Sequence, residues 1–123
     1  MAVTREDVDL MLRLDQAFRP SKEAKKFVWS EALAAIVEDR TFFEAYALDS
    51  DARFHVNEVA TYYEMVGMLW QKGLLDLELL MEWVPASTYW TKIGPILVQA
   101  REVFDSPGLW VHFEALAGAQ QRS

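Results

Sequence analysis

The stretch ARFHVNEVATYYEMVGMLWQK, from Ala52 to Lys72, decides the fold of this chain. Its apolar residues recur every three or four positions, which predicts an α-helix with one buried face. Residues 49–51 offer N-cap oxygens ahead of it, and Gly73 suits a left-handed C-terminal cap. The sequence therefore predicts a long central helix at about residues 52–72. Its main apolar stripe consists of Val56, Val59, Tyr63, Val66 and Trp70.

A second stripe, which is polar, runs beside the apolar one on the same predicted helix. Asn57, Glu64 and Gln71 recur every seven residues, and Ala60 and Gly67 lie between the two stripes. Small residues at such positions let the backbone of a neighbouring helix approach closely. We therefore expect Glu64 to lie at a contact between two helices rather than on an open face.

Arg101 is the predicted partner of Glu64. In the later segment YWTKIGPILVQAREVF (residues 89–104), Arg101 shares a face with Leu97 and Phe104. A guanidinium on an apolar face needs a buried partner, because an isolated charge is costly there. A carboxylate can pair with it through two hydrogen bonds. The leading hypothesis is a buried ion pair that joins the central helix to the helix of residues 89–104.

Other interpretations of Glu64 stay open. Glu31 competes as a partner for Arg101, because it lies on the apolar face of an earlier predicted helix. A cavity beside Asn57 and Tyr63 would instead give Glu64 a ligand-binding or catalytic role. Plain exposure of Glu64 to solvent is the third alternative.

Capping residues divide the rest of the chain into further predicted helices. The whole chain, residues 1–123, is expected to be one all-α domain of five to seven helices around an aromatic-rich core. The tail AGAQQRS is expected to be frayed. The expected helices run from Thr4 to Phe18, from Ser21 to about Asp39, over TFFEAYAL (41–48), over LELLMEWV (77–84) after Asp76, from Ser87 to Phe104 with a kink at Pro95, and over PGLWVHFEALAG (107–118) after Ser106.

The net charge of -7 restricts the classes of partner. Direct binding to nucleic acid needs a basic patch, and adsorption to anionic membranes does too. The only basic cluster, residues 22–26, is interrupted by Glu23. No stretch reaches the length of about 18 apolar residues that a membrane span needs. Because cysteine and a signal peptide are absent from the sequence, we expect a cytoplasmic protein that does not insert into a membrane.

No pattern in the sequence indicates catalysis, a metal site or a cofactor. The two histidines, His55 and His112, are unclustered, so we expect no metal. No glycine-rich phosphate loop and no nucleophile motif is present. Met65 and Met68 lie away from the main apolar stripe, and methionines on such a face suit adaptable contacts with a partner. They are the candidate interface residues, unless other helices cover them.

The second half of the chain resembles a family of small all-helical bacterial domains of unknown function. The resemblance lies in VNEVATYYEMVGMLWQKGLLDLELLMEW, YWTKIGPILVQAREVF and LWVHFEAL, and covers about residues 54–117. The resemblance implies an all-helical fold but no particular biochemical activity. Members of the family often have a membrane-spanning segment ahead of the domain, and we expect none in this chain.

Three hypotheses for the function follow. The leading one is a non-catalytic module for protein–protein interaction or self-association. The second is a small-molecule-binding or enzymatic domain that uses a pocket near Glu64, Arg101, Asn57 and Tyr63. The third is an acidic inhibitor of a nucleic-acid-handling enzyme, which requires the negative charges to gather on one face.

Overall fold

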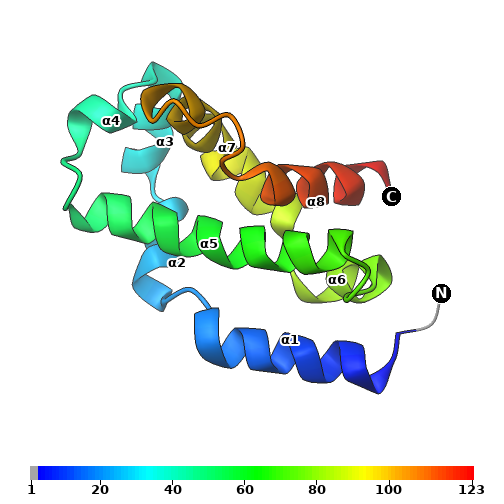
Figure 1. The fold of residues 1–123 in the computed structure, drawn as a ribbon. Helices are drawn as coiled ribbons and strands as arrows, with labels where there is room; N and C mark the ends of the chain where they lie inside the picture. The colour runs from blue at the N-terminus through cyan, green and yellow to red at the C-terminus, as the bar shows by residue number, and fades with distance from the viewer. Residues whose placement is uncertain (1–2) are drawn as a thin grey trace.

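A computed structural model of the protein describes residues 3–123. Within that part of the chain there are eight helices and no strand (Figure 1), so the all-α prediction is confirmed. The number of helices is one above the upper end of the expected range. The helices are α1 (Arg5–Phe18), α2 (Lys22–Val28), α3 (Glu31–Asp39), α4 (Phe42–Ala45), α5 (Asp51–Gln71), α6 (Leu77–Trp83), α7 (Ala86–Val103) and α8 (Val111–Arg122).

The additional helix arises because the helix expected from Ser21 to Asp39 is divided at Ser30. The Ser30 hydroxyl donates to the carbonyl of Phe27, at 2.6 Å, and accepts from the backbone N–H of Leu33, at 3.2 Å. One serine side chain therefore closes the end of α2 and caps the start of α3.

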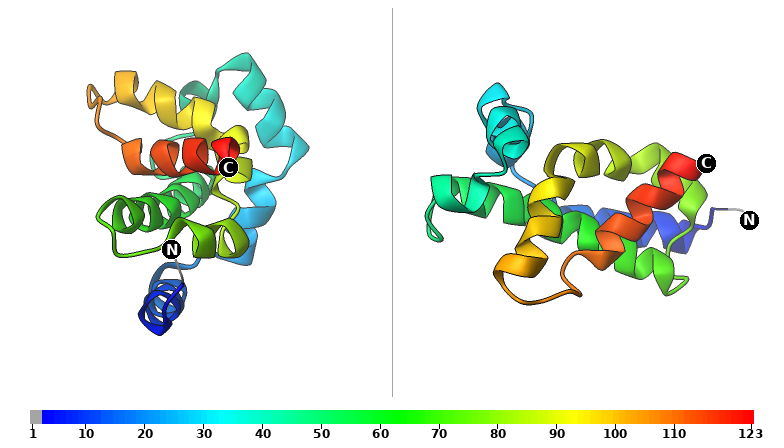
Figure 2. Two further views of the ribbon diagram at one scale, coloured as in Figure 1. Left: turned by 90° about the vertical axis from the view of Figure 1, so that its right-hand side faces the viewer. Right: turned by 90° about the horizontal axis from the view of Figure 1, so that it is seen from above.

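The central helix α5 organises the molecule. Helix α8 packs against both α5 and α7, and α2 packs on α5. Helix α1 runs beside α5 on the side opposite to α7 and α8 (Figure 1; Figure 2, left). The core is rich in aromatic side chains: the ring of Tyr63 stacks on that of Phe113 with centroids 5.0 Å apart, and Trp90 meets Phe113 edge-on.

The ends of α5 lie within one residue of the predicted bounds. The Ser50 hydroxyl accepts the backbone N–H of Arg53 at 3.3 Å. At the other end Gly73 has φ of 79°. The backbone N–H groups of Gly73 and Leu74 donate to the carbonyls of Trp70 and Leu69, each at 2.9 Å. This pair of hydrogen bonds is the Schellman arrangement that the position of Gly73 predicts.

The predicted caps of two further helices are also present. Thr4 and Asp7 form a capping box at the start of α1, in which each side chain accepts the backbone N–H of the other residue. Asp76 accepts the backbone N–H of Glu78 at 2.8 Å and caps α6.

The predicted start of the last helix, at Ser106 and Pro107, is wrong. Helix α8 begins at Val111, after Trp110 in a left-handed conformation with φ of 62°. The reason lies at the end of α7, where the backbone N–H of Ser106 donates to the carbonyl of Arg101 at 2.8 Å. Asp105, with φ of 48°, takes the left-handed position of that C-terminal cap. Ser106 therefore closes one helix instead of opening the next.

The predicted start of α7 and the predicted fraying of the C-terminal tail are also wrong. Ser87 does not precede its helix, because α7 already begins at Ala86. The tail is not frayed, because α8 continues to Arg122 and Gln120 is only 7% exposed. The Gln120 amide donates to the carbonyls of Leu80 (3.1 Å) and Val84 (2.8 Å), and its oxygen accepts the backbone N–H of Ser87 at 3.1 Å. It thereby bridges the end of α6 and the start of α7.

The left-handed position of Gly73 can be tested by substitution. We expect Gly73→Ala to lower the free energy of unfolding by about 1 kcal/mol, since an added Cβ penalises positive φ. There is space for the added methyl group, because no atom from elsewhere in the chain would lie within 4 Å of it. Gly108→Ala is the matched control, because that Cβ would also meet open space while φ there is not positive. Urea denaturation that gives equal free energies of unfolding for the two variants would contradict this assignment.

Candidate functional site

The carboxylate of Glu64 caps the N-terminus of α8. Its Oε1 accepts the backbone N–H of Phe113 at 2.8 Å. Phe113 lies in the first turn of α8, where backbone N–H groups lack partners within the helix. Trp110, at the N-cap position, provides no side-chain hydrogen bond. Glu64 therefore supplies from α5 the acceptor that α8 lacks, and its negative charge suits the positive end of the helix.

Gly67 and Gln71, on the same side of α5, also meet α8. A Cβ at Gly67 would lie 2.3 Å from the carbonyl oxygen of His112, which is impossible without a shift of the backbone. The side chain of Gln71 hydrogen-bonds Nδ1 of His112. The close approach expected at Gly67 is therefore present, but the neighbour is α8 and not the helix of residues 89–104.

The predicted ion pair between Glu64 and Arg101 is wrong. Arg101 donates from Nη2 to the carboxylate of Glu114 at 3.0 Å and from Nε to the carbonyl of Leu109 at 2.7 Å. The side chain of Arg101 is 18% exposed, so the need for a partner was inferred correctly. A carboxylate in α8 fills that need, and Glu31, the competing candidate, is exposed to solvent.

The four predicted site residues do not share one pocket. Tyr63 is buried against Phe113, Glu64 caps α8, and Arg101 holds the turn before α8. Only Asn57, which is exposed, lines a cavity of substantial size. A joint catalytic or ligand-binding role for these four side chains is therefore not supported.

The candidate interface methionines are half-buried. Met65 packs against the core, while Met68 lies on the same side of α5 with part of its side chain in solvent. Their role in an interface stays a prediction.

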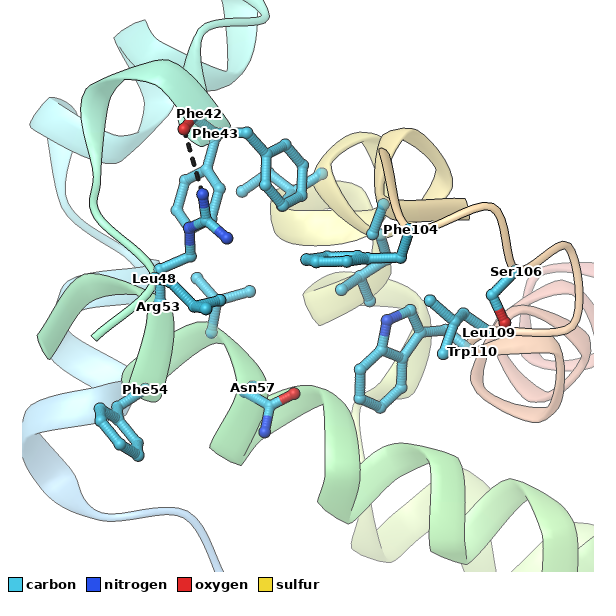
Figure 3. A pocket seen from close by; sticks show the side chains of 14 residues that line it. Phe42, Phe43, Leu48, Arg53, Phe54, Asn57, Phe104, Ser106, Leu109 and Trp110 are labelled. Carbon is cyan, nitrogen blue, oxygen red and sulfur yellow. Dashed lines mark hydrogen bonds between the residues drawn. The ribbon is translucent and has the colours of Figure 1, made fainter. Parts of the chain in front are cut away.

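A large cavity lies between α4, the start of α5, the end of α7 and the turn before α8 (Figure 3). Its volume is about 500 Å³, which falls within the range of ligand pockets. Its walls are mostly aromatic and aliphatic. The lining residues are Phe42, Phe43, Leu48, Arg53, Phe54, Val56, Asn57, Ile96, Leu97, Ala100, Phe104, Ser106, Leu109 and Trp110.

Several large apolar side chains around this cavity are strongly exposed. Leu48 is 74% exposed, Phe54 66% and Phe104 50%. Single exposed apolar residues are ordinary, but a group of them around one apolar hollow is typical of a binding surface. We call Leu48, Phe54 and Phe104 the apolar rim.

Arg53 is the one charged residue in the lining. Its Nε donates to the carbonyl of Tyr46 and its Nη2 to the carbonyl of Phe43, each at 3.1 Å. The guanidinium carbon lies 4.6 Å from the centroid of the Phe43 ring, which gives a cation–π contact. These contacts hold α4 and the following turn against the start of α5.

Sequence reasoning missed this pocket. One signal was available: Phe54 lies opposite the main apolar stripe of α5, and a large aromatic residue there has no helix to pack against within the predicted pattern. The convergence of Leu48, Phe104 and Trp110 on the same place depends on how α4, α7 and α8 are arranged.

A smaller polar hollow lies beside α1. The Asp15 carboxylate accepts hydrogen bonds from the Tyr62 hydroxyl and from Nε1 of Trp83. Burial, and then the hydrogen bond to Asp15, raises the pKa of Tyr62; burial likewise raises the pKa of Tyr63. Both phenols therefore stay protonated at neutral pH. Among residues 3–123, no group of three His, Asp or Glu side chains is placed to hold a metal ion.

Comparison with known proteins assigns the chain to a protein family. A family model described as a domain of unknown function (DUF4760) matches residues 3–120, so the chain belongs to this family. The resemblance seen at residues 54–117 is confirmed, and it extends over the first half of the chain. Nothing matches among curated proteins or among solved structures. No helix within residues 3–123 combines the length and the apolar character that crossing a membrane requires.

The role of Glu64 as a cap can be tested by mutation. We expect Glu64→Ala to lower the free energy of unfolding by about 1–2 kcal/mol, because the N–H of Phe113 loses its acceptor. Glu64→Gln keeps an acceptor oxygen and loses only the charge, so its cost is expected to be about 0.5 kcal/mol.

A double-mutant cycle with Arg101→Met provides the control for the ion pair. In urea denaturation the effects of Glu64→Ala and Arg101→Met are expected to add to within about 0.5 kcal/mol, because the two side chains have different partners. A coupling energy of about 2 kcal/mol or more would instead indicate a direct ion pair between Glu64 and Arg101.

Proposed function

We propose, since the chain belongs to a family with no assigned activity, that this domain is a non-catalytic protein-interaction module. The cavity bounded by α4, α5 and α7 would receive a large apolar side chain of a partner protein, and the apolar rim would be covered by the partner surface around it. The observation that carries this proposal is the exposure of Leu48, Phe54 and Phe104 around one cavity of about 500 Å³.

The rim favours a protein over a small molecule as the occupant. A small ligand would fill the hollow and leave Leu48 and Phe54 in water, because these side chains are exposed over most of their surface. A protein surface would cover the hollow and the rim together. Burial of apolar area stabilises an association by about 25 cal/mol per Å² before the costs of binding are subtracted. Apolar anchors in such pockets are the usual centres of binding energy.

The chemistry of the lining supports binding rather than catalysis. The lining contains no His, Asp, Glu, Lys or Tyr, so no general base or acid faces the cavity. Ser106 lines it without a base among the other lining residues, and a serine nucleophile needs one.

The acidic-inhibitor and small-molecule hypotheses explain the cavity and its apolar rim less completely. An acidic inhibitor would act through carboxylates, and none lines the cavity. A small molecule in the same cavity would leave the rim unexplained. Self-association is a special case of the proposal, in which the partner surface belongs to a second copy of the chain.

Selection of peptides from a randomised display library tests the proposal. We expect the domain to enrich peptides that contain a large aromatic or aliphatic residue. The double variant Leu48→Asn with Phe54→Gln is expected to bind these peptides at least tenfold more weakly, which corresponds to about 1.4 kcal/mol. Because both side chains are exposed, the free energy of unfolding is expected to change by no more than about 0.5 kcal/mol.

Leu74→Gln is the matched control. Leu74 is also exposed, but it lies beyond the opposite end of α5 and does not line the cavity. Its replacement is expected to leave peptide binding unchanged. Failure to enrich any peptide, or equal loss of binding in the Leu74 variant, would contradict the proposed function.

A further inference from the structure

We infer that the partner segment carries a carboxylate beside its apolar anchor, and that this carboxylate binds the guanidinium of Arg53. The inference rests on the proposed function, because it concerns the same cavity and names the chemistry of the occupant. The occupant is a protein segment in which Asp or Glu lies within a few residues of a large apolar side chain.

The first observation is the charge of the lining. The chain has 19 acidic and 12 basic residues and a net charge of -7. The lining of this cavity nevertheless contains one charged residue, and that residue is an arginine. The lining itself is therefore of the opposite sign to the protein as a whole. A ligand inside the cavity meets the Arg53 guanidinium at contact distance, where a charge acts more strongly than the more distant carboxylates of the chain.

The second observation is the set of donors that Arg53 still has free. A guanidinium has five N–H donors. One on Nε and one on Nη2 are taken by the carbonyls of Tyr46 and Phe43, and no other acceptor for the guanidinium is found within residues 3–123. Carbonyls and the Phe43 ring compensate a positive charge only in part, and no carboxylate in residues 3–123 pairs with Arg53.

Arg101 provides the comparison inside the same chain. It is also partly buried and also donates from Nε to a backbone carbonyl, that of Leu109. Its Nη2, however, binds the carboxylate of Glu114. In both arginines Nε donates to a backbone carbonyl, but only Arg101 also binds a carboxylate. The partner would supply the missing carboxylate to Arg53.

The position of Arg53 in α5 strengthens the preference for an anion. It lies in the first turn of the helix, where a cation is disfavoured and an anion is favoured by the helix dipole. The apolar walls beside Arg53 reduce the effective dielectric constant and strengthen a hydrogen-bonded pair of its guanidinium with a carboxylate.

The arrangement in the cavity fits a carboxylate and an apolar group side by side. Figure 3 shows Arg53 at the edge next to Phe43, with Phe104 and Trp110 across the cavity. An apolar anchor would lie against Phe104 and Trp110 while the carboxylate reaches Arg53. A phosphate group fits less well, because it carries up to two charges and no second cation lines the cavity.

The test uses the peptides selected against the wild-type domain, residues 1–123. We expect an enriched Asp or Glu near the apolar residue. In fluorescence anisotropy, replacement of that Asp or Glu by Asn or Gln in a synthetic peptide is expected to weaken binding to the wild-type domain about tenfold, which is 1.4 kcal/mol. The same change in the peptide is expected to have no effect on binding to Arg53→Met. Arg53→Lys is expected to fall between the two, since an ammonium lacks the planar fork of donors.

The peptide pair keeps the test decisive even if Arg53→Met lowers stability through the lost bonds to Phe43 and Tyr46, because both peptides are measured on the wild-type domain. Equal affinity of the acidic and amide peptides would overturn the inference and leave the proposed function standing. Absence of any enriched peptide would overturn both. Binding of decanoate in the cavity without enrichment of peptides would also overturn both, in favour of a small amphipathic acid.

Discussion

The hydrogen bond from the backbone N–H of Phe113 to the carboxylate of Glu64 fixes the start of α8 on the central helix α5. It provides a cap that the sequence before α8 does not contain, and Gly67 lets α8 approach closely enough to form it. With α8 in this place, Trp110 reaches the cavity and Gln120 reaches the ends of α6 and α7. The position of one helix therefore determines both the packing of the second half and one wall of the candidate site.

Distant side chains satisfy helix ends at several places in this fold. Glu58 accepts the backbone N–H of Ser21 at the start of α2, as Glu64 does for α8, and Gln120 serves α6 and α7 together. Backbone groups at helix ends cost free energy when they are buried without partners. The partly buried Glu58, Glu64 and Gln120 side chains meet that requirement here.

Three exposed apolar side chains and an arginine with free donors meet at the cavity. Leu48, Phe54 and Phe104 remain in contact with water although they are large and apolar. Arg53 keeps donors that no residue in the described part of the chain accepts from. Folding gains nothing from an exposed apolar side chain or from the donors of Arg53 that stay free. A binding partner would use both, and for this reason the candidate function belongs at this place.

The sequence by itself determined the all-α class, the bounds of α5, the left-handed Gly73 and the caps at Thr4, Ser21 and Asp76. These features depend on groups within one or two helical turns, and local residue types specify them. Only the tertiary structure decided the partners of Glu64 and Arg101, the start of α8 and the existence of the cavity. The atoms that meet there are far apart along the chain, with Glu64 and Phe113 separated by 49 positions, so several acceptors and donors could satisfy the same need. Periodicity shows that a side chain faces another helix, but the packing of the whole chain selects which helix that is.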